Sequence, residues 1–149
     1  MSVANELPKL FERDLSRLRK EVAAFSSDEM LWQTLPGITN SAGNLALHLE
    51  GNLREFIGRQ LGGLDYQRDR PLEFSLRGLT RAALDERLAA LTATIPPVVA
   101  ALTDARLSAT FPENVLGEPL TTRHFVIHLH GHLTYHLGQI NYLRRMLME

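Results

Sequence analysis

Five of the six histidines lie within thirteen residues near the C-terminal end of the sequence. Four of them recur at every fourth position, a spacing that places side chains on one face of a helix, one turn above another. Two imidazoles four residues apart can bind the same metal ion. The spaced set is His124, His128, His132 and His136, and the fifth residue is His130. These residue types and this spacing point first to metal chemistry.

The apolar positions of the same segment rank these histidines. At about 100° per residue, His136 lies about 40° from the centre of the apolar face and His132 about 80°. His130 lies about 80° away on the opposite flank, where no other histidine accompanies it. His128 and His124 lie farther out, at about 120° and 160°. We therefore expect His132 and His136 to face the protein interior and His124 to be solvated.

A third ligand would have to come from elsewhere in the chain, and the only other histidine is His48. It falls on the polar flank of a predicted helix, about 60° from Leu45, which suits an edge of the core. The competing interpretation is that each histidine is an ordinary hydrogen-bonded core residue. Against it, burying two imidazoles without partners costs free energy. Periodicity alone leaves both interpretations open.

Missing residues exclude other chemistries. The sequence contains no cysteine, which excludes disulfides, a thiolate zinc site and a cysteine nucleophile. It contains no Glu-x-x-His, which a ferritin-like di-iron site requires, and no His-Glu-x-x-His. A bound metal would therefore have three neutral imidazoles and open positions. Zinc fits such a set, and nickel, iron or manganese would also be accommodated.

The composition indicates one globular domain spanning residues 1–149. Hydrophobic residues make up 44% and charged residues 22%, and the net charge is −1. Such a balance argues against a nucleic-acid partner, which favours a basic surplus. No apolar run approaches the ~18 residues of a membrane span, and the first residues lack a signal-peptide pattern. We expect a cytoplasmic protein without a membrane partner.

Apolar spacings of three and four predict helices and no strands. Pro96-Pro97 should kink the third long helix near Ile95 or divide it in two. The polar stretch Asp65–Gly78 should run over the surface. Its Arg68 and Arg70 could bind an anionic substrate, but we expect them to be solvated. The connection there, roughly 17 residues, is longer than the loop of a tight helical hairpin and allows a long crossover between helices two and three.

The sequence predicts four long helices and one short one. The long helices are Val3–Phe25, which Pro8 could shorten, Ala42–Leu61, one after Thr80, and one from Thr121 or Thr122 to the C-terminus. The short helix is Asp28–Leu35, after a Ser26/Glu29 capping box. We therefore predict an all-α four-helix bundle.

Two segments resemble signatures of the DinB-like (damage-inducible) superfamily. Residues Thr39–Leu49 read TNSAGNLALHL and resemble its second helix. Residues His132–Ile140 read HLTYHLGQI and resemble its fourth helix, a histidine pair followed by Gly-Gln. Trp32 and Pro36-Gly37 also stand where the family usually has them. The resemblance covers most of the chain.

The resemblance implies an up-down-down-up bundle in which His48, His132 and His136 match the metal-binding triad. Members are often dimeric, and the apolar positions left over around a small core also favour a homodimer. Some relatives are thiol-dependent transferases or isomerases in which the metal activates bacillithiol, mycothiol or glutathione. The function expected is therefore that of a metal-dependent enzyme acting on a small molecule, by thiol-dependent S-transfer with a low-molecular-weight thiol cosubstrate or by hydrolysis. The alternative is a metal-binding or stress-response protein without turnover.

Four further residues are candidates for lining the site or for orienting the metal ligands through hydrogen bonds. They are Asn52, Tyr135, Gln139 and His128. Each of them also suits an ordinary polar position in a bundle. A pairing of His128 with His132 in place of the triad stays open at this point.

Overall fold

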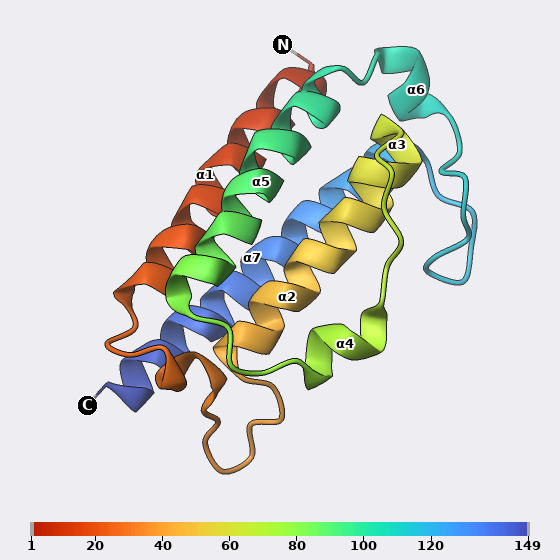
Figure 1. Cartoon of the computed structure of the whole chain (residues 1–149). Coiled ribbons are helices and arrows are strands. Elements are labelled where there is room, and N and C mark those ends of the chain that lie inside the picture. The colour runs from red at the N-terminus through yellow and green to blue at the C-terminus, as the bar shows by residue number, and fades with distance from the viewer. Residues whose placement is uncertain (1, 149) are drawn as a thin grey trace.

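The computed structural model describes residues 2–148 and is all-helical, as predicted (Figure 1). Four long helices lie side by side: α1 (Val3–Ala24), α2 (Ala42–Leu53), α5 (Arg81–Ala100) and α7 (Thr122–Leu147). Within residues 2–148 there is no β-strand, and a single isolated bridge joins Thr110 to Thr121. No helix of this part of the chain is both long and apolar enough to cross a membrane.

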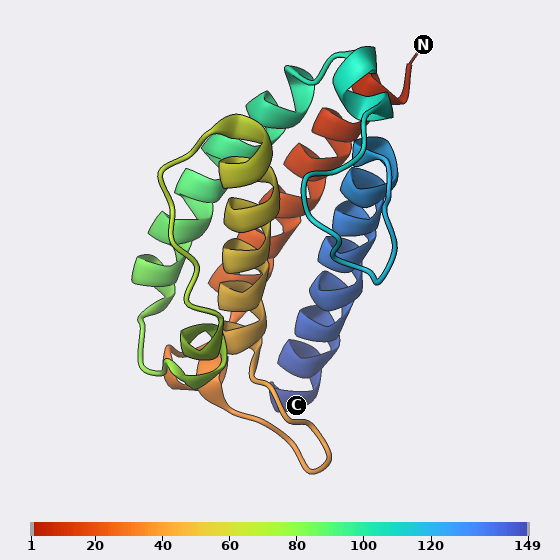
Figure 2. The same ribbon diagram turned by 90° about the vertical axis from the view of Figure 1, so that its right-hand side faces the viewer.

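The helices pack as a square in which α1 and α2 each contact α5 and α7. Helices α1 and α7 start at one end of the molecule, whereas α2 and α5 start at the other (Figures 1 and 2). The chain between α3 (Gln60–Gly62) and α5 returns along the side of α2 and includes the short helix α4 (Arg70–Ser75). A second short helix, α6 (Asp104–Ser108), lies in the connection to α7. Thus α4 brings part of the long connection against α2.

Side-chain caps fix the start of each long helix. The hydroxyls of Ser2, Ser41, Thr80 and Thr121 accept hydrogen bonds from backbone N–H groups in the first turn of α1, α2, α5 and α7. Such caps satisfy donors that have no partner inside the helix. Because Ser2 caps α1, Pro8 lies inside that helix and does not mark its start.

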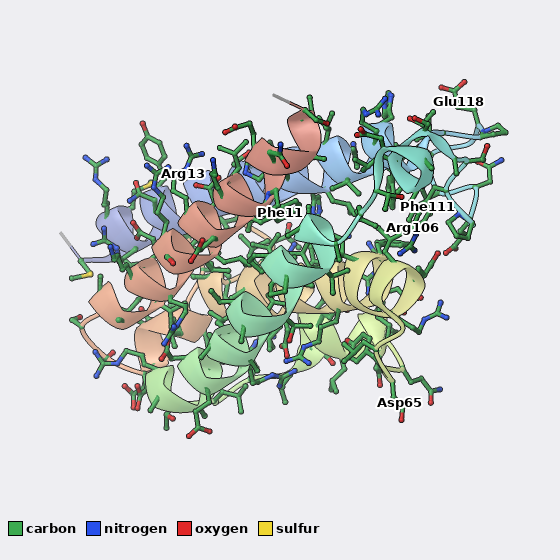
Figure 3. The ribbon with its side chains drawn as sticks, turned by 90° about the horizontal axis from the view of Figure 1, so that it is seen from above. Phe11, Arg13, Asp65, Arg106, Phe111 and Glu118 are labelled. Atoms are coloured by element: carbon green, nitrogen blue, oxygen red, sulfur yellow. The ribbon has the colours of Figure 1, made fainter. Side chains whose placement is uncertain are left out.

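All 12 residues of α2 are buried, because α4 and the long connection cover the side of this helix that faces away from the bundle. The core around it combines leucines with buried aromatic rings such as Phe11, Phe25 and Phe125. Figure 3 shows Phe11 among the helices and Arg13, Asp65 and Glu118 at the periphery. A polar side chain on α2 is therefore held in a low-dielectric setting.

The expected division of the helix at Pro96-Pro97 is wrong, because α5 runs unbroken from Arg81 to Ala100, and the expected kink near Ile95 stays a prediction. The two prolines fall within the last five residues, so they remove only two backbone donors near the end of the helix. Ile95, Pro96 and Val99 are buried, and their packing holds this last turn against the core.

Two other segments differ from their predicted form. The second long helix continues past Leu53 as a π-helical segment, η2 (Arg54–Arg59), followed by α3. It ends at Gly63, whose φ of 69° is the left-handed conformation typical of a C-terminal glycine. The short helix is a 3-10 turn, η1 (Glu29–Trp32), and the Ser26 capping box does not form because Ser27 accepts from the Met30 N–H instead.

We predict that Phe11→Ala lowers the free energy of unfolding by about 3–5 kcal/mol, because it empties a fully buried ring position. Ile127→Ala removes a side chain that is 47% exposed, and should change stability by no more than about 0.5 kcal/mol. Urea denaturation followed by circular dichroism measures both. Equal losses in the two variants would contradict this placement of the core.

Candidate metal centre

Three imidazoles from two helices point their Nε2 atoms at a common position. Nε2 of His132 lies 3.2 Å from Nε2 of His48 and 3.1 Å from Nε2 of His136. The three candidate ligand atoms all lie within 4.8 Å of one another. His132 and His136 are one turn apart on α7, and α2 beside it supplies His48. The structure thus brings together the three histidines that the family resemblance singles out.

The ring orientations explain how three bulky side chains meet at their nitrogen edges. Each pair of rings is close to perpendicular, with interplanar angles of 79°, 84° and 89°. The ring centroids are 4.5–5.3 Å apart. Perpendicular packing keeps the rings from stacking and leaves their nitrogen edges facing one another.

A carboxylate from the long connection orients His48. Nδ1 of His48 lies 3.0 Å from Oε1 of Glu73, a buried residue of α4. Arg68 donates to both oxygens of the same carboxylate, at 2.8 and 2.9 Å. Burial alone would raise the pKa of Glu73, but hydrogen bonds from His48 and Arg68 hold it below its usual value. Because an ionised carboxylate only accepts hydrogen bonds, Nδ1 of His48 carries a proton, and in the neutral ring the Nε2 lone pair faces the other imidazoles.

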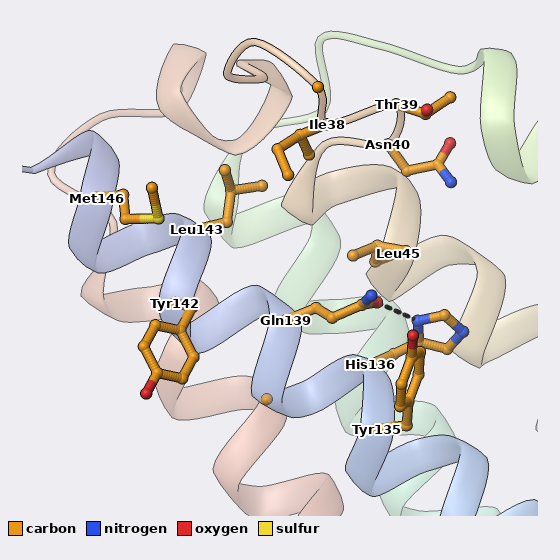
Figure 4. A pocket seen from close by; sticks show the side chains of 12 residues that line it. Ile38, Thr39, Asn40, Leu45, Tyr135, His136, Gln139, Tyr142, Leu143 and Met146 are labelled. Carbon is orange, nitrogen blue, oxygen red and sulfur yellow. Dashed lines mark hydrogen bonds between the residues drawn. The ribbon is translucent and has the colours of Figure 1, made fainter.

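Gln139 plays the same part for His136. Its side-chain oxygen lies 2.7 Å from Nδ1 of His136, one turn along α7 (Figure 4). An amide oxygen is an acceptor, so the proton of His136 also sits on Nδ1 and its Nε2 lone pair also points inward.

The ring of His132 lies between those of His48 and His136, but no residue accepts a hydrogen bond from its buried Nδ1 within the described residues. Burial, followed by the proximity of His136 and His48, lowers the pKa of His132 from 6.5 to about 4. Burial also lowers the pKa of His136. The surroundings of His132 and His136 therefore favour the neutral imidazole near neutral pH, which is the form that binds metals.

The donor set fits a divalent metal. With the protons of His48 and His136 held on Nδ1, two Nε2 lone pairs converge on the third ring, which can donate one proton at most. A cation at the centre would satisfy all three lone pairs at once. Neutral imidazoles whose far nitrogens donate to a carboxylate or an amide oxygen are the usual arrangement of metal-ligating histidines.

The triad separates two cavities. The larger, about 660 Å³, is reached from His136 and is mainly apolar, with Ile38, Leu45 and Leu143 on its walls (Figure 4). The smaller, about 350 Å³, has His48 and His132 on its wall. A small molecule in either cavity would lie beside the triad.

The other residues proposed from the sequence differ in their distance from the triad and in their exposure to solvent. Asn52 is buried beside the smaller cavity, and Tyr135 is 65% exposed with its ring 5.2 Å from that of His136. His128 is exposed and stacks on Phe125, outside the group of three. His124 is exposed, as predicted. The geometry therefore groups His132 with His48 and His136, not with His128.

His130 belongs to a separate polar contact. Its Nε2 lies 2.9 Å from Oδ2 of Asp14, a fully buried carboxylate of α1. Burial alone would raise the pKa of Asp14, but hydrogen bonds with Arg13 and His130 hold it below its usual value. This pair joins α1 to α7 as a satisfied core interaction.

Glu73 is not among the residues predicted from the sequence. Arg68 was expected to be solvated, whereas its side chain is only 14% exposed. One signal could have indicated the contact. Gly51 lies inside α2, and a Cβ there would collide with the carboxylate of Glu73. A glycine inside a helix costs stability relative to alanine, so it often marks a close approach of another group.

Comparison with known proteins assigns the chain to a family. The model of the DinB superfamily matches residues 10–140. The chain belongs to the DinB superfamily. The resemblance of the two histidine segments to that superfamily is thereby confirmed. No curated protein matches the sequence.

Two solved structures share the DinB fold of this chain. A conserved protein from Enterococcus faecalis is 19% identical, with a TM-score of 0.76 over 99% of this chain and 98% of its own. A DinB-like protein from Bacillus cereus is 16% identical, with a TM-score of 0.68 over 90% of this chain and 85% of its own. At these identities the similarity concerns the fold alone.

The lowered pKa of His132 predicts the acid sensitivity of the metal-free protein. The unfolded chain binds a proton on this residue near 6.5, whereas the folded chain resists it until about pH 4. The stabilisation is therefore complete above pH 6.5 and is lost as the pH falls toward 4, on the order of 2–3 kcal/mol. Urea denaturation of chelator-treated protein across this range measures it.

The matched variants are His132→Gln, which removes the titrating group, and His124→Gln, which removes an exposed one. We expect the first to reduce the decline between pH 6.5 and 4, leaving the part that His136 contributes, and the second to leave the decline unchanged. The same decline in His132→Gln as in the unmodified chain would show that another group causes it.

Proposed function

We propose that this DinB protein is a metal-dependent enzyme in which His48, His132 and His136 hold one divalent metal ion. The observation that carries the proposal is the convergence of three Nε2 atoms, with His48 and His136 oriented by Glu73 and Gln139. Three neutral imidazoles suit zinc, and nickel, iron or manganese would also be accommodated.

The metal, when bound, would supply a positive charge that lowers the pKa of a thiol or a water molecule next to it. The chain has no cysteine, so the nucleophile would come from a cosubstrate thiol or from water. The reaction proposed is therefore thiol-dependent S-transfer or hydrolysis of a small molecule. Glu73 and Gln139 would keep His48 and His136 in the tautomer whose Nε2 binds the metal.

An enzyme is favoured over a purely structural metal site because the group contains three ligating side chains among residues 2–148. Structural zinc sites usually have four protein ligands, whereas catalytic sites leave a position open. The cavities on both sides of the triad give a substrate room to reach that position.

The proposal includes the up-down-down-up topology that the superfamily resemblance implies. The helix directions in Figure 1 and the long connection between α3 and α5 support it. It also includes a homodimer. Exposed Tyr135, Tyr142 and Met146 lie along one side of α7, and a second copy of the chain could bury them.

The direct test of the metal site is elemental analysis of the purified, untagged protein. We predict about one divalent metal ion per chain, and its loss in His48→Ala, His132→Ala and His136→Ala because each removes one of three ligands. His124→Ala is the matched control, since it removes an exposed histidine of the same helix, and it should keep the metal. Normal metal content in His136→Ala would overturn the assignment.

Light scattering at micromolar concentrations tests the homodimer. We predict a mass about twice that of one 16.8 kDa chain. Tyr142→Lys should shift the mass toward a single chain, because it places a charge on the exposed side of α7. A single-chain mass for the unmodified protein at all concentrations would rule the dimer out.

A further inference from the structure

The smaller cavity beside the triad differs in character from the larger one. We propose that it binds a small organic anion, such as a carboxylate, whose own N–H or O–H group donates a hydrogen bond to Asn52. The inference rests on the proposed metal site, because His48 and His132 form one wall of this cavity. It names the chemical class of the molecule that would be held there.

The charge of the lining favours an anion. Two arginines, Arg68 and Arg70, line the cavity, and no carboxylate among the described residues does. Arg70 is exposed and lies over the ring of Phe74, at 5.3 Å, without an ion-pair partner in this part of the chain. Arg68 uses Nε and Nη2 to hold Glu73, and its Nη1 makes no hydrogen bond within residues 2–148. Both guanidinium groups therefore keep donors for a ligand, in a form suited to a carboxylate.

Asn52 supplies the second, independent observation. Its side chain lies on the cavity wall one helical turn from His48, and the residue is 8% exposed. Its Oδ1 is buried and makes no hydrogen bond within the described residues. A buried acceptor without a donor costs free energy, so an unpaired amide beside a cavity points to a ligand that donates to it.

Position and size connect this subsite to the triad. A cavity of about 350 Å³ is large enough for a molecule of modest size. Its other walls include Phe56, Val115 and Leu116, so a ligand would contact apolar groups on the walls away from the arginines, Asn52 and the histidines. An anion fixed at Arg70 and Asn52 would place its remaining atoms next to His48 and His132.

Three probes of nearly the same shape separate charge from hydrogen bonding. N-acetylglycine carries a carboxylate and an amide N–H, N-acetylglycinamide lacks the charge, and levulinate replaces the N–H by CH₂. Each is titrated into the zinc-loaded full chain and into the chelator-treated chain, with affinity measured by NMR chemical-shift changes. We expect N-acetylglycine to bind about fivefold more tightly than either of the other two, from one exposed ion pair and one hydrogen bond.

Variants assign the two preferences to their residues. Arg70→Gln should remove the preference over N-acetylglycinamide, whereas Arg77→Gln, an exposed arginine outside the cavity, should keep it. Asn52→Leu should remove the preference over levulinate and keep the preference for charge. Because Asn52 is buried, the unfolding temperature of the Asn52→Leu variant is compared with that of the unmodified chain. Arg70 is exposed, so the Arg70→Gln variant gives a test that does not depend on the folding of a core variant.

Equal binding of all three probes by the unmodified protein would overturn the inference, as would an Arg70→Gln variant that keeps the preference for charge. The metal site is judged separately by zinc content. Zinc bound at the triad without probe preference would contradict this inference alone. Probe preference in a chain that binds no zinc would contradict the proposed function and support the anion subsite.

Discussion

The hydrogen bond between Nδ1 of His48 and Glu73 joins three parts of the molecule at once. It ties α2 to α4, it orients the His48 ring toward α7, and it lets Arg68 be held by the same carboxylate. Burying either His48 or Glu73 without the other would raise the free energy of the folded state, because a buried charge or imidazole without a partner loses its hydrogen bonds to water. Gly51 permits the contact, since any side chain there would occupy the place of the carboxylate. The long connection is thus held in place by the chemistry of the site.

The same helix α7 carries a second histidine–carboxylate pair, and the comparison shows what makes a candidate metal centre. His130 faces one buried carboxylate, Asp14, which satisfies its Nε2. In the triad, by contrast, a carboxylate and an amide oxygen accept from the outer nitrogens of His48 and His136, while the three inner nitrogens face one another. The hydrogen bond between His130 and Asp14 completes the first arrangement, whereas the second has three facing nitrogens, the ligand atoms of a candidate metal site.

Local pattern predicted much of this arrangement. The apolar spacing of α7 placed His132 and His136 toward the interior and His124 in solvent, because a regular helix converts sequence spacing directly into direction. Periodicity placed His48 only at an edge of the core, and the superfamily resemblance joined it to the pair. Glu73, Arg68 and Asp14 escaped prediction because their partners are distant in sequence, and a charged residue in a polar stretch looks solvated until the fold is known. Pro96-Pro97 did not divide α5 in two, because the packing of Ile95, Pro96 and Val99 against the core outweighed the local preference.

X-ray absorption spectroscopy of the zinc-loaded, untagged protein tests the central claim most directly, because it reports the atoms that surround the ion. The account predicts three imidazole nitrogens at about 2.0–2.1 Å and at least one further light atom that a small molecule can replace. The His48→Ala variant should lose this signature. A zinc ion surrounded by four protein ligands, or the same three-nitrogen signature in His48→Ala, would contradict it.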